Sequence, residues 1–526
     1  MSRPFHRRIR SRRFALPAAL AILAVAAWFR IAGTLAEPLW LDEAYSAYAA
    51  GKGFAFLWQV VPSYETHPPF YYSLLRIWTM AFGDSLGGHR ALGIIAGLAA
   101  LPMTYLAARE AALLLGRKGR LAGIVAAALV AIAPMAVEMS REVRPYPLMI
   151  LAYAAALTAM FRIGRAVKDG RGLPRHGFPL WLLCLALMLW LHNLGPLFAG
   201  ALGIGLLAMV AARGLPLADW RRLLIGHALV MAIWLPALMI LADQAPTWMK
   251  STWLRFEWTG LSRKLYFLYG VPGEAMLAAA ALAVLGLWTL LRSGDGRRVA
   301  IALLAAAIVP VAASILVSVL VAPVFIVRIM TPVVVPTAIL FALGIAGQRG
   351  WLRVAGFAAL LWLSGQMIRN DLAARERGSL QDWYRAVAWL GPRLGPGDRV
   401  LAYPNEGALP LDYALRDRRI ALPVDPVPVA VPAIGVGGWY PTGSRGVVSL
   451  PRDRLRAIAR SDRVRAVPTV WLLRLGPWAY DKGDVFMEEL SADRVPVARY
   501  RDGPIDIVGL RATLSSRTGL PLPSAP

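Results

Sequence analysis

The sequence predicts a polytopic α-helical membrane protein with a small polar α/β domain at its C-terminal end. Three observations lead to this fold class. The 526 residues are 58% hydrophobic, with a mean hydropathy of +0.53, which is more apolar surface than a soluble core of this size can bury. The apolar residues gather in runs that approach the roughly 20 residues of a membrane span. After residue 370 these runs shorten to strand length and charged residues become frequent.

The charge is strongly basic but is distributed as in a membrane protein. The formal net charge is +26, and the arginines lie mainly between the apolar runs. There they orient helices and meet anionic headgroups, so nucleic acid is not an expected partner. A single cysteine, Cys184, excludes a disulfide within the chain and a thiolate metal site.

Basic loops also predict the topology. The arginines between Arg3 and Arg13 place the N-terminus in the cytoplasm, so the first span, Phe14 to about Ala36, leads outside. The segment Pro69 to Phe82 is too short for a comfortable span and is predicted to lie at, or re-enter, the outer interface. With Ala91 to Leu115 as the second span, every later basic loop falls inside. About eleven spans result, and the tail after Asn370 lies outside.

Two domains are therefore expected. Residues 1–370 form the transmembrane domain, with a first extracytoplasmic loop at about 37–90, and residues 371–526 form an extracytoplasmic α/β domain. In the second domain, the pattern predicts helices at Asp382–Leu390 and Pro410–Leu415 and strands at Arg399–Tyr403, Val470–Leu473 and Ile505–Leu510. The Pro- and Gly-rich stretch from Pro423 to Gly446 is predicted to be a loop, and Ser515 to Pro526 to be disordered.

The first outer loop holds the most informative polar residues. Asp42 and Glu43 place adjacent carboxylates at the membrane surface, which is costly unless they are used or paired. They can also cap a helix or pair with Arg30 or Lys52. His67 lies just before two prolines that fix the entry to the short interfacial helix, and can donate a hydrogen bond to an anion.

Three further outer loops carry candidate ligands for a phosphate. The second contains Arg141, Arg144 and Tyr146, the third His192, and the fourth Arg328. Each taken alone fits an interfacial anchor or a satisfied interface residue. Together on one face they fit a lipid-phosphate site, in which guanidinium groups bind the phosphate, a carboxylate binds a hydroxyl and aromatic rings contact sugar.

These motifs, in this order, resemble the GT-C superfamily of membrane glycosyltransferases, specifically the bacterial family 39-like branch related to protein O-mannosyltransferases and aminoarabinose transferases. The resemblance rests on the following motifs: Leu41-Asp42-Glu43-Ala44-Tyr45, His67-Pro68-Pro69-Phe70-Tyr71-Tyr72, Phe82-Gly83-Asp84 with Arg90, Ser140-Arg141-Glu142-Val143-Arg144-Pro145-Tyr146 and His192. Some relatives carry an aspartate in the second outer loop, where this chain has Arg144 and Tyr146.

The resemblance implies transfer of a sugar from a polyprenyl-phosphate donor to an acceptor hydroxyl, with inversion. It implies that Asp42 activates the acceptor, and we expect Glu43 to orient Asp42 or the acceptor. The other site residues expected are, for the donor phosphate, His67, Arg141, Arg144, Tyr146 and Arg328, and, for the substrates, Tyr45, Glu65, Tyr71 and His192. No cofactor is required, because arginines can stabilise the departing phosphate, and no metal-ligand spacing is present; dependence on a divalent metal is left open.

The expected location is the bacterial inner membrane, with the active site and the C-terminal domain on the periplasmic side. The acceptor is a lipid, a polysaccharide or a protein of the cell envelope, and the sugar, a hexose or a pentose, is open. Two alternatives remain: a lipid-carrier enzyme of the O-antigen-ligase kind, and a polytopic transporter or flippase, which would place ionisable groups near the middle of the membrane.

Overall fold

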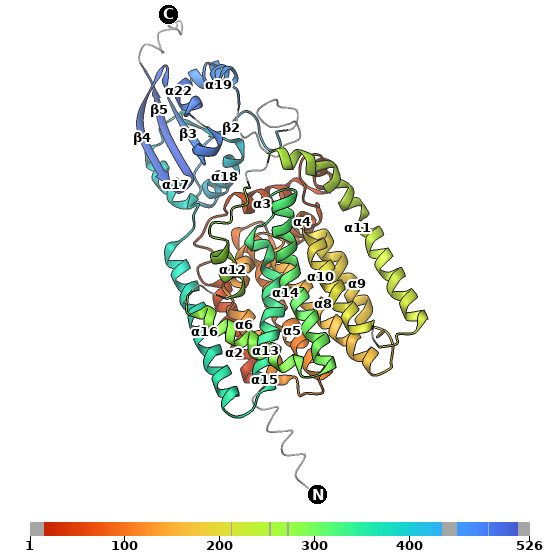
Figure 1. The fold of residues 1–526 in the computed structure, drawn as a ribbon. Coiled ribbons are helices and arrows are strands. Elements are labelled where there is room, and N and C mark those ends of the chain that lie inside the picture. The colour runs from red at the N-terminus through yellow and green to blue at the C-terminus, as the bar shows by residue number, and fades with distance from the viewer. Residues whose placement is uncertain are drawn as a thin grey trace, which may run out of the picture. The chain divides into compact units, whose positions relative to one another are not determined.

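The computed structural model describes residues 15–211, 213–251, 254–270, 273–433, 450–481 and 483–513 (Figure 1). These form two compact units. Unit 1 takes its described residues from Met1–Thr34, Ala81–Leu241 and Trp253–Glu376, and unit 2 from Leu35–Met80, Ala242–Thr252 and Arg377–Pro526. The N-terminal arginines, most of the Pro- and Gly-rich stretch and the predicted disordered end lie outside the described residues.

Unit 1 is helical. The bounds of its helices are α2 Ala15–Ile31, α5 Leu86–Leu114, α6 Arg120–Ile132, α7 Pro134–Arg141, α8 Tyr146–Lys168, α9 Gly177–Leu191, α10 Gly195–Val210, α11 Leu217–Ser251, α12 Leu261–Tyr269, α13 Ala275–Leu291, α14 Gly294–Leu320, the 3₁₀-helix η3 Val327–Val333, α15 Val334–Gly347 and α16 Gly350–Arg377.

The predicted multi-pass membrane protein is confirmed. Among the described residues, six helical segments are long and apolar enough to cross a membrane, and the bent pair α6–α7 passes the same test as one broken span. Four shorter apolar helices, α2, α9, α10 and α13, fall below the length of these spans, so six or seven of the predicted spans are found at full length among the described residues. The outward side chains of α11, such as Leu224 and Ile225, are exposed, as expected for a surface that lipid covers.

Small residues let the helices of unit 1 pack closely. Gly286 of α13 faces Gly344 of α15, and a Cβ at Gly286 would lie 2.6 Å from the carbonyl oxygen of Leu340. Only glycine fits at this crossing, because the two backbones nearly touch. Replacement by a larger residue would separate α13 from α15.

The break between α6 and α7 sets the direction of α7, whose residues line the pocket described below. Pro134 has no N–H to continue the helix, and the chain bends by 58°. The buried Arg30 guanidinium donates to the carbonyl oxygens of Val130 and Ala131, at 3.3 and 2.8 Å, and to the hydroxyl of Ser140 at 3.2 Å. Arg30 thus satisfies backbone groups at the break and ties α2 to both halves, instead of pairing with Asp42 or Glu43.

Unit 2 contains a mixed sheet, whose five described strands are β1 Arg399–Tyr403, β2 Val424–Pro426, β3 Thr469–Leu475, β4 Arg494–Asp502 and β5 Ile505–Ala512, in the order β2-β1-β3-β5-β4. β1 pairs in parallel with β2 and β3, whereas β5 is antiparallel to β3 and β4. Its helices are α3 Leu41–Lys52, η1 Phe56–Val60, η2 Val61–Ser63, α4 Phe70–Phe82, α17 Trp383–Leu390, η4 Gly391–Arg393, η5 Asn405–Gly407, α18 Ala408–Asp417, α19 Arg452–Ala459, α20 Asp462–Arg465, α21 Pro477–Tyr480 and α22 Val485–Ser491.

Helices cover both faces of this sheet, which explains why β3 is buried throughout and β1 from Val400 to Tyr403. Alternate residues such as Leu472 and Leu510 pack against Leu455 of α19 and Phe486 of α22. On the other face, the ring of Trp471 meets Trp389 of α17 and lies so close to Gly509 that a Cβ there would be 2.7 Å from it.

The predicted elements of this domain are found within two residues of their expected ends. Asp382 caps α17 by accepting a hydrogen bond from the N–H of Arg385 at 2.9 Å. The carboxylate of Asp398 accepts from Gly395 N–H, Thr469 N–H and Trp471 Nε1–H, which joins the turn before β1 to β3. The prediction missed β4 and the short β2, which begins inside the stretch predicted to be a loop. Pro496 and a bulge interrupt the alternation of β4.

The segment that carries the acidic pair belongs to the same unit as the C-terminal domain. The N–H of Leu41, at the start of α3, donates to Oε1 of Gln381 at 3.2 Å. Tyr48, further along α3, donates through its hydroxyl to the carbonyl oxygen of Val431 at 2.6 Å. α3 also contacts α18 and η5. Contacts between residues 340 or more positions apart in the sequence therefore fix α3, the helix that contains Asp42.

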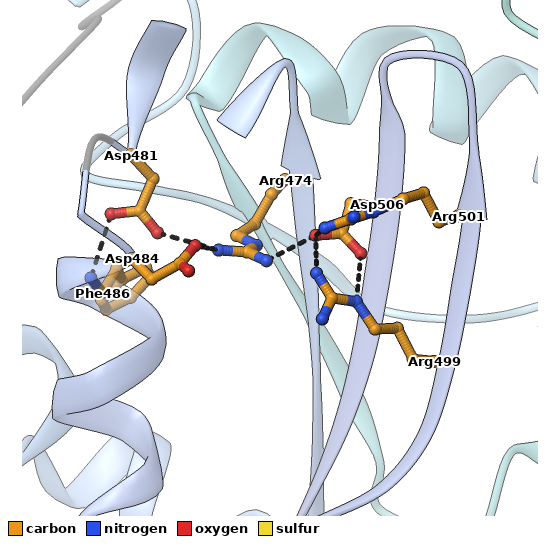
Figure 2. Close-up of polar contacts among 7 residues, drawn as sticks. All are labelled: Arg474, Asp481, Asp484, Phe486, Arg499, Arg501 and Asp506. Atoms are coloured by element: carbon orange, nitrogen blue, oxygen red, sulfur yellow. Dashed lines mark hydrogen bonds and ion pairs between the residues drawn. The ribbon is translucent and has the colours of Figure 1, made fainter. Parts of the chain in front are cut away.

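A buried charge cluster joins β3, β4, β5 and the segment before α22 (Figure 2). Arg474, 1% exposed, lies between the carboxylates of Asp481 and Asp484 on one side and that of Asp506 on the other. Arg499 adds a bidentate contact to Asp506, at 2.8 and 2.9 Å. Burial alone would raise the pKa of Asp506, but the hydrogen bonds from Arg499 and the charge of Arg474 lower it below its ordinary value.

Replacing Arg474 by methionine is expected to destabilise this domain by roughly 3–5 kcal/mol at neutral pH, because the carboxylates of Asp506 and Asp481 stay buried without their central cation. Limited proteolysis of the full-length protein in detergent measures the loss. Arg511→Met, at an exposed position of β5, is the control and should change stability by less than about 0.5 kcal/mol.

The dependence of stability on pH gives a second test of Arg474→Met. Because the pKa of Asp506 is depressed in the folded protein, its stabilising contribution is present above the ordinary carboxyl value of 3.8 and is lost as the pH falls through the folded value. Arg474→Met should therefore lose its disadvantage towards acidic pH. Equal protease resistance of this variant and the wild type at neutral pH would contradict the account.

Candidate active site

The acidic pair of the first outer loop lies in the first turn of α3. Glu43 is buried, and its carboxylate accepts a hydrogen bond from the backbone N–H of Trp40 at 3.2 Å, so Glu43 caps its own helix. Asp42 precedes it and is only partly buried. The positive end of the helix dipole stabilises a carboxylate at this place. The capping alternative thus describes Glu43, and the pair divides into a structural and an accessible carboxylate.

The predicted substrate-binding tyrosines belong to one aromatic cluster of unit 2. The hydroxyl groups of Tyr45 and Tyr64 are 2.8 Å apart. The ring of Tyr72 lies edge-on to that of Tyr45, at 5.7 Å between centroids, and is 5.8 Å from that of Tyr71. All four side chains are buried. Their rings hold α3 and α4 together, so they shape the surroundings of Asp42.

Glu65 and His67 form a pair in the turn before α4. Nδ1 of His67 is 2.9 Å from Oε1 of Glu65, and the backbone N–H of His67 donates to the same oxygen at 3.2 Å. The carboxylate fixes the imidazole ring through this double contact and favours a proton on Nδ1.

Four of the residues predicted from separate outer loops meet in unit 1. Nε of Arg328 donates to the hydroxyl of Tyr146 at 3.2 Å, and the guanidinium of Arg144 lies over the Tyr146 ring at 5.7 Å from its centroid. The ring of His192 is 6.1 Å from the same ring, and its Nδ1 accepts the N–H of Leu194 at 3.1 Å. Tyr146 is thus the common contact of two cations and a histidine.

Arg141 takes a different place from these four. It ends α7, and its Nε donates to the hydroxyl of Thr34 at 3.3 Å. This contact ties the end of α7 to the segment after α2. Of the five donor-phosphate candidates, Arg144, Tyr146 and Arg328 thus lie together and Arg141 contacts Thr34, while His67 belongs to unit 2.

Arg328 also lines a pocket of about 360 Å³ within unit 1. The other walls come from α7 and its end and from α12, and both helices contact each other and η3. The charged side chains among the described lining residues are Glu138, Glu142, Arg263, Lys264 and Arg328, and the apolar ones are Met135, Met139, Phe267, Ile326 and Val327.

Sequence reasoning missed four of these charged residues. Arg263 and Lys264 form a basic pair directly before Leu265, Tyr266 and Phe267, in a segment between two apolar runs. That combination of cations and aromatic residues was the available signal. Glu138 and Glu142 lie four residues apart at the end of α7 and share a face because of the helical period. Carboxylates of the second outer loop thus reach a pocket, although Arg144 and Tyr146 occupy the matching motif positions.

An apolar cavity adjoins the charged pocket. Met135 and Phe267 line both spaces, so the two meet at these side chains. Beyond them the cavity is lined by apolar residues of α6, α12 and α15 and by Met367 of α16. This cavity has a volume of only about 20 Å³, which is room for about one water molecule.

Comparison with solved structures shows where this fold occurs. The structure is similar to that of ArnT from Cupriavidus metallidurans bound to undecaprenyl phosphate, with 13% identity, a TM-score of 0.56 and coverage of 94% of this chain and 97% of that chain. It is also similar to the oligosaccharyltransferase of Archaeoglobus fulgidus in the apo form, with 11% identity, a TM-score of 0.52 and coverage of 97% and 75%.

These similarities confirm the predicted GT-C fold. No family model and none of the curated proteins matches the sequence. The similarity is therefore one of backbone architecture over nearly the whole chain. At this low sequence identity it does not transfer the roles of individual residues.

Proposed function

We propose that the protein is a glycosyltransferase that moves a sugar from a polyprenyl-phosphate donor to an acceptor hydroxyl on the periplasmic face of the bacterial inner membrane. The observation that carries the proposal is the pocket of about 360 Å³ in which Arg263, Lys264 and Arg328 lie among apolar side chains such as Met135 and Phe267. A phosphate with a long hydrocarbon chain has this amphipathic character. Two solved structures of the same fold hold such molecules: ArnT holds undecaprenyl phosphate and an archaeal oligosaccharyltransferase holds a dolichol-phosphate.

The cations of the pocket supply what departure of the carrier requires. Arg328, Arg263 and Lys264 would bind the phosphate and stabilise the negative charge that grows on it as its bond to the sugar breaks. Tyr146 would hold Arg328 through their hydrogen bond and would itself be held by Arg144 and His192. His67 and Arg141, also predicted for the phosphate, remain candidates for other contacts with the donor.

In the proposed reaction, the acceptor oxygen attacks the anomeric carbon and Asp42 takes the hydroxyl proton. The bond between that carbon and the phosphate oxygen breaks, and its electron pair leaves with the carrier phosphate. One displacement inverts the anomeric configuration. Glu43 holds the first turn of α3 by its cap, and Tyr45, Glu65 and Tyr71 shape the surrounding surface. The scheme needs no metal ion, because arginine and lysine supply the positive charge.

Transfer of labelled sugar from synthetic polyprenyl-phosphate donors tests the proposal in membranes that contain the protein. Lipid, polysaccharide and protein fractions are counted separately, so the labelled fraction names the acceptor class. Membranes without the protein are the control. Lack of transfer from every donor, together with movement of a lipid or solute across the membrane, would instead support the transporter alternative.

A further inference from the structure

The charged pocket of unit 1 contains two carboxylates that phosphate binding does not explain. Glu138 lies in the last turn of α7 and Glu142 directly follows that helix. Both line the same space as Arg263, Lys264 and Arg328. Carboxylates repel a phosphate, so these two lower the affinity of the pocket for phosphate alone.

The charges of the pocket balance for one kind of donor. Among its described lining residues are three cations and two carboxylates, which leaves a formal charge of +1. The phosphate of a sugar linked to a polyprenyl carrier is a diester with one negative charge. A donor with an uncharged sugar therefore brings the site to neutrality, and an amino sugar leaves it at +1. A sugar that carries a carboxylate leaves it at −1.

Hydrogen bonding also favours a neutral or cationic sugar over a uronic acid. Ionised glutamates only accept hydrogen bonds. Sugar hydroxyl groups and an ammonium group donate to them, whereas the carboxylate of a uronic acid offers no hydrogen. Its charge would also lie beside two groups of the same sign, which repel it.

We propose that Glu138 and Glu142 select the sugar of the donor by its charge: they admit neutral and cationic sugars and reject uronic acids. This inference rests on the proposed function, because it assumes that the pocket binds the sugar next to its phosphate. It assigns to the end of α7 a role in donor specificity, distinct from the role of the cations in binding the carrier.

Matched donors test the inference. Each pair has the same polyprenyl phosphate and the same ring and differs only at carbon 6, where a hydroxymethyl group is replaced by a carboxylate: glucose and glucuronic acid, mannose and mannuronic acid, galactose and galacturonic acid. For the ring that the wild type uses best, the kcat/KM of the neutral donor should exceed that of the uronate by about tenfold or more.

Glu138→Gln/Glu142→Gln keeps the shape of both side chains and removes their charge. It is expected to reduce this ratio by about tenfold, mainly through a higher kcat/KM for the uronate donor. Glu274→Gln, at an exposed glutamate that does not line the pocket, should leave the ratio unchanged. Membrane insertion and thermal stability are compared for the wild type, the double variant and Glu274→Gln. If the double variant is poorly inserted, Glu138→Gln and Glu142→Gln are measured singly in its place.

The outcomes separate this inference from the proposed function. Equal transfer of the neutral and uronate donors by the wild type overturns the charge selection and leaves the transferase intact. A strong preference that the glutamine substitutions do not change also overturns it, because the selection then lies elsewhere. Transfer from no donor at all removes the proposed function, on which the inference depends.

Discussion

Asp42→Asn is expected to lower the rate of sugar transfer by roughly 10²–10⁴-fold, the range that removal of a general base usually costs. Asparagine keeps the size of the side chain and its place in the first turn of α3 but does not take a proton at neutral pH. The KM for the donor should stay nearly constant, since the phosphate cations are untouched. Single-turnover transfer of labelled sugar in proteoliposomes measures the chemical step apart from binding.

The control for this variant is Asp169→Asn, which removes an exposed aspartate that pairs with Arg171 at 2.6 Å. It should insert and transfer sugar like the wild type. Glu43→Gln adds a structural comparison, because glutamine can still accept the hydrogen bond from the N–H of Trp40. Full activity of a well-inserted Asp42→Asn protein would exclude Asp42 as the base.

Arg328→Gln is expected to lower kcat/KM for the donor by about 10²–10³-fold, because a cation that stabilises the departing phosphate is lost. Tyr146→Phe removes only the hydroxyl that accepts from Nε of Arg328 at 3.2 Å, and should cost about five- to tenfold. Steady-state kinetics at varied donor concentration give both values.

The double variant shows whether the two residues act together. If Tyr146 works by holding Arg328, Tyr146→Phe should have little further effect once Arg328 is glutamine, and the two effects will not add. Arg328→Lys keeps the charge but loses the planar fork and should lie between the wild type and Arg328→Gln. Additive effects of the two single changes would mean that Tyr146 meets the substrate independently of Arg328.

Several features of this protein follow from local sequence. The apolar runs define the spans, because a lipid-exposed helix needs about 20 apolar residues whatever its neighbours are. The Gly395-Pro396-Gly397-Asp398 turn and the apolar run after it predict the buried strand β1, and Asp382 predicts the start of α17. β4 escaped prediction because Pro496 and its bulge break the alternation on which a strand is recognised.

The candidate site was predictable only as a set of residues. Arg144, His192 and Arg328 carry charge or hydrogen-bonding groups at the ends of apolar runs, where such groups are costly unless they are used. Nothing in their spacing names Tyr146 as their common contact. That contact depends on how α8, α9 and η3 pack, which is set by side chains throughout the bundle.

The sequence alone thus predicted the membrane class, the apolar helices, the small C-terminal α/β part and the acidic and basic residues proposed for the site, because each depends on composition or on neighbours within a few residues. Tertiary structure alone decided three further matters: the division of labour between Asp42 and Glu43, the packing of α3 against residues near position 400, and the pocket that joins Arg328 to Glu138, Glu142, Arg263 and Lys264. Each of these features depends on contacts between residues that are distant in the chain or on the direction in which a helix end points its groups. Such contacts form only when the chain has folded.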